Sequence, residues 1–223
     1  DVFHSSYVNS IRTPLILKHI GKNAFAHSMI EEIFLSDSLS FIGDAAFSYA
    51  SSLKQVGKYP KMLTFIPKEC FKYCISLESM ELHDGICDIY DDAFSNAQRY
   101  EPEIPKSLRF IGNRAFSYSH IDTVVLPENV SVSSNAFYSC NNLNHVELPT
   151  SFHSVDVNGI ISSCGNLKTL VLKSPTVVVG NSKSLFLNGC PDDVVIKVPS
   201  FLVNSYFHQI PNVHLHTLRL THF

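Results

Sequence analysis

A short apolar phrase recurs along the chain, and this recurrence constrains the fold more than any single residue does. The phrase reads HIGKNAF at 19–25, FIGDAAF at 41–47 and FIGNRAF at 110–116. Self-similarity at a fixed period marks repeat architectures, in which each copy is one unit stacked on its neighbours. The recurrence therefore predicts a solenoid rather than a globular enzyme.

The closing phenylalanine of the phrase gives the period. It lies at Phe25, Phe47, Phe71, Phe94, Phe116 and Phe137, and we place Ile161 and Leu187 at the same position of two degenerate copies. The steps are 22, 24, 23, 22, 21, 24 and 26 residues, an average of about 23, which is a leucine-rich-repeat period. Since one coil cannot bury its own apolar edge, we expect these side chains to form a single interior column.

The remainder of each copy predicts strands and turns. In the segment NNLNHVELP, alternation points Leu143, Val146 and Leu148 inward and His145 and Glu147 outward. A proline, which lacks a backbone donor, then ends the strand at one offset in four copies: Pro105, Pro127, Pro149 and Pro199. The predicted fold is a right-handed, mostly β leucine-rich-repeat solenoid of about eight coils with little helix.

Some positions depart from the pattern. Copy two has LKQVGKYP where Leu-Pro is expected and copy four has YEPEIP, so we expect the array to bulge or bend there. Gly43 and Gly112 of the recurring phrase are expected to supply a φ-permissive bend.

The combination of IGxxAF, YSCNNLxxVxLP and this period resembles the BspA-type (Treponema pallidum-type) leucine-rich repeats of surface proteins in host-associated bacteria and some parasitic protists. The resemblance covers residues 15–199. We expect a single domain over 1–223, with a partial N-terminal coil at 1–14 and a C-terminal cap at 200–223. In the cap we expect a helix from Ser200 presenting Phe201, Tyr206 and Phe207, followed by a final strand. The resemblance implies an extracellular or cell-surface location, and we expect the native protein to continue upstream of Asp1.

Charge and hydropathy bear on the partners. Lys plus Arg number 17 against 20 Asp plus Glu, so the chain lacks the basic field that nucleic acid or an anionic membrane requires. No run of eighteen apolar residues occurs. We expect no nucleic-acid partner, no membrane insertion and a monomer.

The outward side chains of the concave sheet face are the candidate ligand-binding residues, because every coil contributes to that face. They are Glu32, Phe34, Ser79, Glu81, Glu101, Glu103, Thr123, Val125, His145 and Glu147. The acidic members and the expected exposure of Phe34, Val125 and Val171 favour a strip for a protein ligand, whereas the alternative is an ordinary solvated sheet face. We predict a non-catalytic protein–protein interaction module. By resemblance it is a surface or secreted adhesin for host matrix or cell-surface proteins.

Two other functions stay open, a rigid spacer of a larger surface protein and a carbohydrate-active solenoid. In the second, the carboxylates of the strip would act as a glycosidase pair. Solvated carboxylates on an open face lack the burial that raises the pKa of a general acid, so we predict no enzyme, no catalytic residue and no cofactor.

Cysteine and histidine residues are the remaining candidates for chemistry. Four cysteines each lie three residues after the recurring phenylalanine position: Cys74, Cys140, Cys164 and Cys190. This placement favours a column of buried thiols over disulfides. His214, His216 and His222 place imidazoles near the C-terminus, but His-x-His pairs are common without metal, and we predict no metal site. Asn129 begins the single glycosylation sequon, meaningful in a secretory eukaryote.

Overall fold

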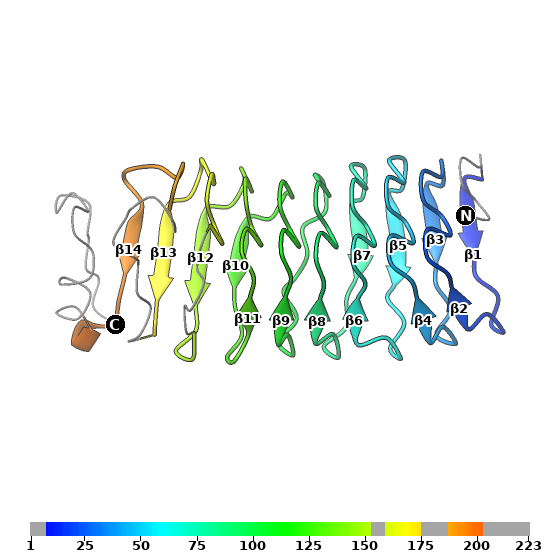
Figure 1. The fold of residues 1–223 in the computed structure, drawn as a ribbon, viewed down its shortest axis with the longest axis horizontal. Coiled ribbons are helices and arrows are strands. Elements are labelled where there is room, and N and C mark those ends of the chain that lie inside the picture. Colours follow the sequence, from blue (N-terminus) through cyan, green and yellow to red (C-terminus); the bar gives the residue numbers. More distant parts are fainter. Residues whose placement is uncertain (1–7, 153–158, 175–186, 203–223) are drawn as a thin grey trace.

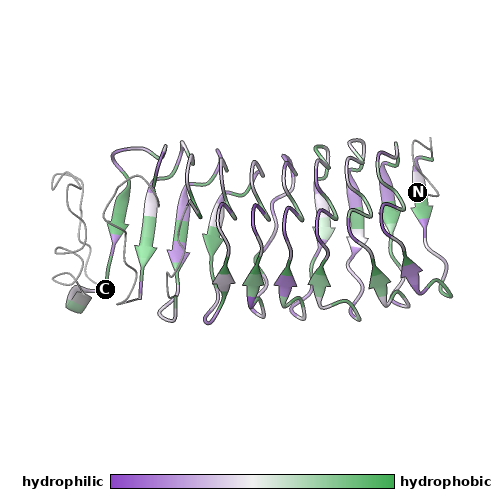
Figure 2. Ribbon diagram, in the orientation of Figure 1, coloured by the Kyte–Doolittle hydropathy of each residue, from purple (hydrophilic) through white to green (hydrophobic). Residues whose placement is uncertain are grey.

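The computed structural model describes residues 8–152, 159–174 and 187–202. The chain winds into a row of coils stacked along one axis (Figure 1). Each complete coil passes through a strand, a turn, a second and shorter strand, and a segment of consecutive turns. Figure 2 shows hydrophobic and hydrophilic residues alternating around the coils, as a single interior side requires.

Every strand pairs in parallel with strands of neighbouring coils, in two sets. The first sheet consists of β1 (Ser10–Arg12), β3 (Glu32–Phe34), β5 (Gln55–Lys58) and β7 (Ser79–Glu81), then, as a separate group, β10 (Thr123–Val125), β12 (His145–Leu148), β13 (Thr169–Leu172) and β14 (Val195–Lys197). The second sheet consists of β2 (His19–Ile20) with β4 (Phe41–Ile42), and of β6 (Phe65–Ile66), β8 (Asp88–Ile89), β9 (Phe110–Ile111) and β11 (Ser131–Val132). Equivalent residues of successive coils are register partners, so like positions form rows along the solenoid.

The predicted phenylalanine column is confirmed. From Phe25 to Phe137 the rings stack on their neighbours with centroids 5.2–5.5 Å apart and planes within 8° of parallel. Ile161 is fully buried and Leu187 packs against the same core. The eight equivalent positions from Phe25 to Leu187, which we call ladder positions, are therefore separated by seven turns of the solenoid. Burial of one such ring contributes about 2–3 kcal/mol, which makes this column a main source of stability.

The backbone beside the column is held by hydrogen bonds between coils. The Phe71 N–H donates to the Ala93 carbonyl at 2.8 Å, and the Phe94 N–H donates to the Ala115 carbonyl at 2.7 Å. The residues two before and two after the ladder position have positive φ, for example Glu69 at 56° and Tyr73 at 58°. Each coil therefore uses two left-handed residues to turn its N–H groups toward the next coil.

Gly43 and Gly112 were expected to supply a bend that needs a permissive φ, and this expectation is wrong. Neither glycine is among the positive-φ residues. A Cβ at Gly43 would lie 2.5 Å from the Lys22 nitrogen, and one at Gly112 would lie 2.5 Å from the Asp91 nitrogen. Glycine is needed there because the backbone of the preceding coil passes too close for a side chain.

The predicted irregularities are confirmed in both copies. In copy two the register between β5 and β7 shifts between Gln55 and Lys58. In copy four, residues 100–105 form no strand, and the first sheet divides there. Pro102 lies buried where the neighbouring coils have the inward Met80 and Val124, and it has no N–H to offer a sheet.

Only part of the predicted ends is described. β1 pairs with β3, so the N-terminal segment supplies a strand to the array. At the other end, a short 3-10 helix, η1 (Ser200–Leu202), begins where the cap helix was predicted. The remainder of the predicted cap, with Tyr206, Phe207 and the three histidines, lies outside the described residues.

Candidate functional site

The predicted strip lies on the outward side of the first sheet, in two groups separated by the irregular copy four. Glu32 and Phe34 are on β3, Ser79 and Glu81 on β7, Thr123 and Val125 on β10, and His145 and Glu147 on β12. Register pairs Thr123 with His145 and Val125 with Glu147. Glu101 and Glu103 belong to no strand, and both are exposed.

Three of the five carboxylates in the strip have partners on the same face. Glu81 lies 3.7 Å from the Lys58 ammonium, and Glu147 forms an ion pair with Lys173. The Ser10 hydroxyl donates to Glu32 at 3.3 Å. Among the residues that the structure describes, Glu101, Glu103 and Glu32 have no ion pair within 4 Å, since the partner of Glu32 is a neutral hydroxyl. Two of the three uncompensated carboxylates of the strip therefore lie together at the interrupted strand.

Two shallow hollows flank this interrupted strand. One, of about 320 Å³, is lined by Glu78, Ser79, Met80, Glu81, Leu82, Tyr100, Glu101 and Glu103. The other, of about 460 Å³, is lined by Glu101, Pro102, Glu103, Ile104, Thr123 and Val125. The Tyr100 hydroxyl donates to the Met80 carbonyl at 3.1 Å, and burial raises the pKa of Tyr100. This hydrogen bond anchors the irregular segment to the preceding coil.

The apolar members of the strip are less exposed than predicted. Val125 is 49% exposed, but the Arg12 guanidinium lies 4.2 Å from the ring centroid of Phe34 and covers it. Val171 is only 3% exposed, and the prediction of an outward apolar side chain there is wrong. Its register partner Glu147 forms the ion pair with Lys173, the residue that follows the end of β13, which places charged groups near Val171.

The predicted buried thiols are confirmed at Cys74, Cys140 and Cys164, whereas Cys190 is only partly buried, and all six cysteines are free. Each of the four thiols donates to the carbonyl of the ladder residue in the preceding coil: Cys74 to Phe47 at 3.1 Å, Cys140 to Phe116 at 3.0 Å, Cys164 to Phe137 at 3.2 Å and Cys190 to Ile161 at 3.0 Å. Burial raises the pKa of the Cys70 and Cys74 thiols, and raises that of Cys140 to about 12. Thiols held protonated in this way are packing groups rather than nucleophiles.

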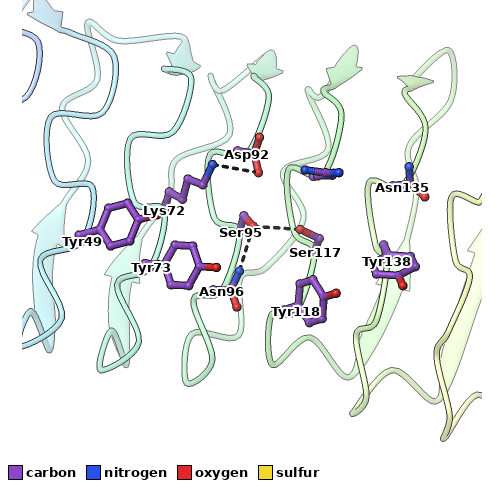
Figure 3. Close-up of a pocket in the computed structure, with 11 residues that line it drawn as sticks. Tyr49, Lys72, Tyr73, Asp92, Ser95, Asn96, Ser117, Tyr118, Asn135 and Tyr138 are labelled. Carbon is purple, nitrogen blue, oxygen red and sulfur yellow. Dashed lines mark hydrogen bonds and ion pairs between the residues drawn. The ribbon is translucent and has the colours of Figure 1, made fainter.

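A second candidate site, which sequence reasoning missed, lies on the turn segments of the middle coils (Figure 3). We call it the tyrosine groove. It has a volume of about 440 Å³ and is lined by Tyr49, Lys72, Tyr73, Asp92, Ser95, Asn96, Arg114, Ser117, Tyr118, Asn135 and Tyr138. The sequence does contain a pattern that indicates this groove: a tyrosine recurs two residues after the ladder phenylalanine, in FSY at 47–49, FKY at 71–73 and FSY at 116–118.

The aromatic side chains of the groove form an interrupted row. The His27 and Tyr49 rings stack with centroids 4.8 Å apart, and the Tyr49 and Tyr73 rings with centroids 4.7 Å apart. The equivalent position of the next coil holds Asn96, after which the row resumes with Tyr118. Tyr138, which stands one residue earlier in its own coil, meets Tyr118 edge-on at 5.5 Å.

Polar groups form the floor and edges of the groove. The buried hydroxyls of Ser95 and Ser117 are 2.9 Å apart, and the Asn96 amide donates to Ser95 at 3.2 Å. The Lys72 ammonium lies 3.6 Å from Asp92 and 4.0 Å from Glu69. Arg114 is exposed and forms no ion pair within the described part of the chain.

Metal binding and membrane crossing have no support in the residues described. No three His, Cys, Asp or Glu side chains within 8–152, 159–174 and 187–202 are grouped as metal ligands would be. In the same ranges, no helix has the length and apolar character needed to cross a membrane. The predicted histidine cluster at the C-terminus lies outside these ranges.

The fold and its repeats define the class, a parallel β solenoid built from leucine-rich repeats. The family model described as BspA type leucine rich repeat region matches six copies, over residues 1–101 and 64–190. The chain belongs to this family, as its repeated phrase predicted. No curated protein sequence matches the chain.

The chain is similar to several solved structures. A leucine-rich repeat protein from Bacteroides ovatus is 25% identical with a TM-score of 0.67, over 88% of this chain and 52% of that one. The pneumococcal vaccine antigen PcpA is 19% identical with a TM-score of 0.58, over 96% of this chain and 66% of that one. A leucine-rich repeat protein from T. pallidum is 21% identical with a TM-score of 0.49, over 97% of this chain and 86% of that one. The chain spans about half the length of the Bacteroides ovatus protein.

Proposed function

We propose that the chain is a non-catalytic protein-binding module of a secreted or cell-surface protein, and that residues 1–223 form one domain. The observation that carries the binding role is the interrupted strand of copy four. There, unpaired Glu101 and Glu103 lie between two hollows, beside the exposed Val125. An exposed acidic segment next to an apolar side chain suits a protein ligand with a basic patch.

Two findings support the location and the lack of catalysis. The pneumococcal relative in fold is described as a vaccine antigen, which agrees with a site accessible from outside the cell. The hollows beside Glu101 and Glu103 are open to solvent, and a carboxylate there is not desolvated as a general acid would be. Such a surface binds a partner without providing the conditions for hydrolysis.

Charge reversal tests the binding role. Wild type and Glu101→Lys/Glu103→Lys are compared for binding to immobilised basement-membrane matrix and to a preparation of epithelial cell-surface proteins. The control is Asp37→Lys/Asp84→Lys, which makes the same charge change at two exposed acids outside the strip. We expect the first variant to lose binding and the control to retain it. Equal binding by all three proteins would refute the role of this surface, and no binding by wild type would favour the rigid spacer.

A hydrolysis assay addresses the carbohydrate-active alternative. Incubation with a panel of plant, bacterial and host polysaccharides should release no reducing ends. Release that is lost in Glu101→Gln/Glu103→Gln would show that the strip is catalytic.

A further inference from the structure

The tyrosine groove has the composition and spacing of a carbohydrate site, and we propose that it binds a linear glycan of hexopyranose units laid along the solenoid axis. This inference concerns a different face and a different ligand class from the proposed protein-binding strip.

The first observation is that the tyrosines occupy positions that do not favour them. Tyr49, Tyr73 and Tyr118 have φ of 59°, 58° and 58°, in the left-handed region where Asn or Gly is preferred. Asn96 at 61° and Gly189 at 74° occupy the same position in other coils. The left-handed conformation costs about 1–2 kcal/mol for a residue with a Cβ.

Packing within the protein offsets only part of that cost. Tyr49, Tyr73 and Tyr118 remain 43%, 37% and 46% exposed, so much of each ring faces solvent. Because the Tyr49 and Tyr73 faces cover each other, the row meets a ligand through its ring edges, and its hydroxyls can hydrogen-bond that ligand. The row therefore has the properties of a binding platform rather than of a core element.

The second observation is the spacing, which distinguishes a glycan from a peptide. Ring centroids repeat at 4.8 and 4.7 Å along the row. A hexopyranose unit in a linear chain is about as long as the rise of one coil, so successive sugars stay in step with successive coils. Side chains on one face of an extended peptide repeat at about 6.6 Å, and these fall out of step after two coils.

The third observation is the gap at Asn96, between Tyr73 and Tyr118 (Figure 3). Two coil steps separate these tyrosines, which corresponds to about 9.6 Å. Two ring contacts of about 4 Å each leave room between them for one substituent of a sugar, such as a hydroxymethyl or acetamido group. That substituent would enter the groove at this point, while the sugar chain continues along the axis over the edges of Tyr73 and Tyr118.

The floor and edges of the groove match the hydroxyl groups of a sugar. The side-chain carbonyl of Asn96 and the hydroxyls of Ser95 and Ser117 supply acceptors and donors at the bottom. Lys72 and Asp92 offer charged partners at one edge, where Glu69 also pairs with Lys72. Arg114, unpaired within the described residues, would additionally bind the carboxylate of a uronic acid.

Calorimetric titration with three defined probes tests the proposal: cellohexaose, chitohexaose, and a hexasaccharide of alternating glucuronate and N-acetylglucosamine. We expect at least one of them to bind. Tyr73→Asn/Tyr118→Asn should weaken that binding by about tenfold or more, because it removes the rings while keeping a residue that suits the left-handed backbone. Asn96→Tyr should do the same by filling the groove, and Arg114→Gln should weaken only the uronic acid probe.

The matched control is Tyr90→Asn, which removes a 39% exposed tyrosine beside the second sheet and should leave affinity unchanged. Glu101→Lys/Glu103→Lys should also leave glycan affinity unchanged, so failure of this proposal and failure of the protein-binding proposal are distinguishable. Absence of binding by all three probes at millimolar concentration overturns the proposal. Binding that is unaffected in Tyr73→Asn/Tyr118→Asn, with native far-UV circular dichroism, overturns it too.

Discussion

At the scale of single residues, the ladder phenylalanines are expected to carry more stability than any other side chains. Phe71 is fully buried and has a parallel ring on each side, Phe47 and Phe94, both within 5.5 Å. Truncation to alanine removes the ring and leaves a cavity that two neighbouring coils border. We expect Phe71→Ala to lower the free energy of unfolding by about 3–5 kcal/mol.

The control is a phenylalanine outside the column. Phe41 is 44% exposed on the second sheet, so Phe41→Ala should cost about 1 kcal/mol or less. Urea titrations of wild type and both variants measure the difference. Equal losses would mean that the column is no more important than the surface aromatics.

The buried thiols predict a pH dependence of stability. Burial raises the pKa of Cys140 to about 12, above its ordinary value near 9. In the unfolded chain this thiol ionises first, so its contribution is fully present below pH 9 and is lost as pH rises from 9 toward 12. The slope in that window reaches about 1.4 kcal/mol per pH unit.

Cys140→Ser isolates this contribution, because a hydroxyl does not titrate in that range and Ser119 already occupies the same position one coil earlier. We expect the stability of the variant, measured by guanidinium unfolding at pH 8 and pH 10, to fall less than that of wild type. An identical decrease in the two proteins would show that this thiol does not govern the alkaline response.

At the scale of strands, Pro102 is expected to be the reason that the first sheet divides. It occupies an inward position at which Val124 of the next coil lies in a strand. Pro102→Val restores the missing N–H and a side chain that favours strands. We expect residues 101–103 to pair with β7 and β10, and the hollows beside Glu101 to shrink.

Hydrogen exchange measures this outcome. The amides of 101–103 should gain protection by about tenfold or more, equivalent to about 1.4 kcal/mol. Glu101→Gln, which changes the same segment without adding a donor, should leave exchange unchanged. Unaltered exchange in Pro102→Val would place the cause of the interruption elsewhere, for instance in the Tyr100 hydrogen bond to Met80.

The sequence predicted these elements well where one rule acts in every coil. Alternation and the 23-residue period place the strands, the phenylalanine column and the thiols, because each is set by burial alone. The exposure of Phe34 was mispredicted because it depends on a long charged side chain from the neighbouring coil, that of Arg12. The tyrosine groove was missed since it depends on one deviation, Asn96, whose meaning appears only when neighbouring coils are stacked.

At the scale of the whole molecule, the interruptions of the two sheets are staggered. The first sheet is interrupted between β7 and β10, and the second between β4 and β6. The phenylalanine column continues past both, from Phe25 to Phe137. Within the described residues, each pair of neighbouring coils is therefore joined by strand pairing, by ring stacking, or by both.

This staggering predicts cooperative unfolding of the array. In repeat proteins, cooperativity depends on the interface between neighbouring coils, and a weak interface would let the two halves unfold separately. We expect urea transitions followed by far-UV circular dichroism and by tyrosine fluorescence to coincide. Circular dichroism reports all strands, whereas tyrosine fluorescence reports the middle coils. The chain has no tryptophan to mask the tyrosine signal.

Phe94→Ala sharpens this test, because Phe94 belongs to copy four, where the first sheet is interrupted, and stacks on both Phe71 and Phe116. Removing its ring leaves the pairing of β8 with β9 in the second sheet as the main connection at that point. We expect the variant to show two transitions or a broadened one, whereas Phe41→Ala should keep a single transition. Two transitions in wild type would contradict the argument, since they would show that the column does not couple the coils across the interruption.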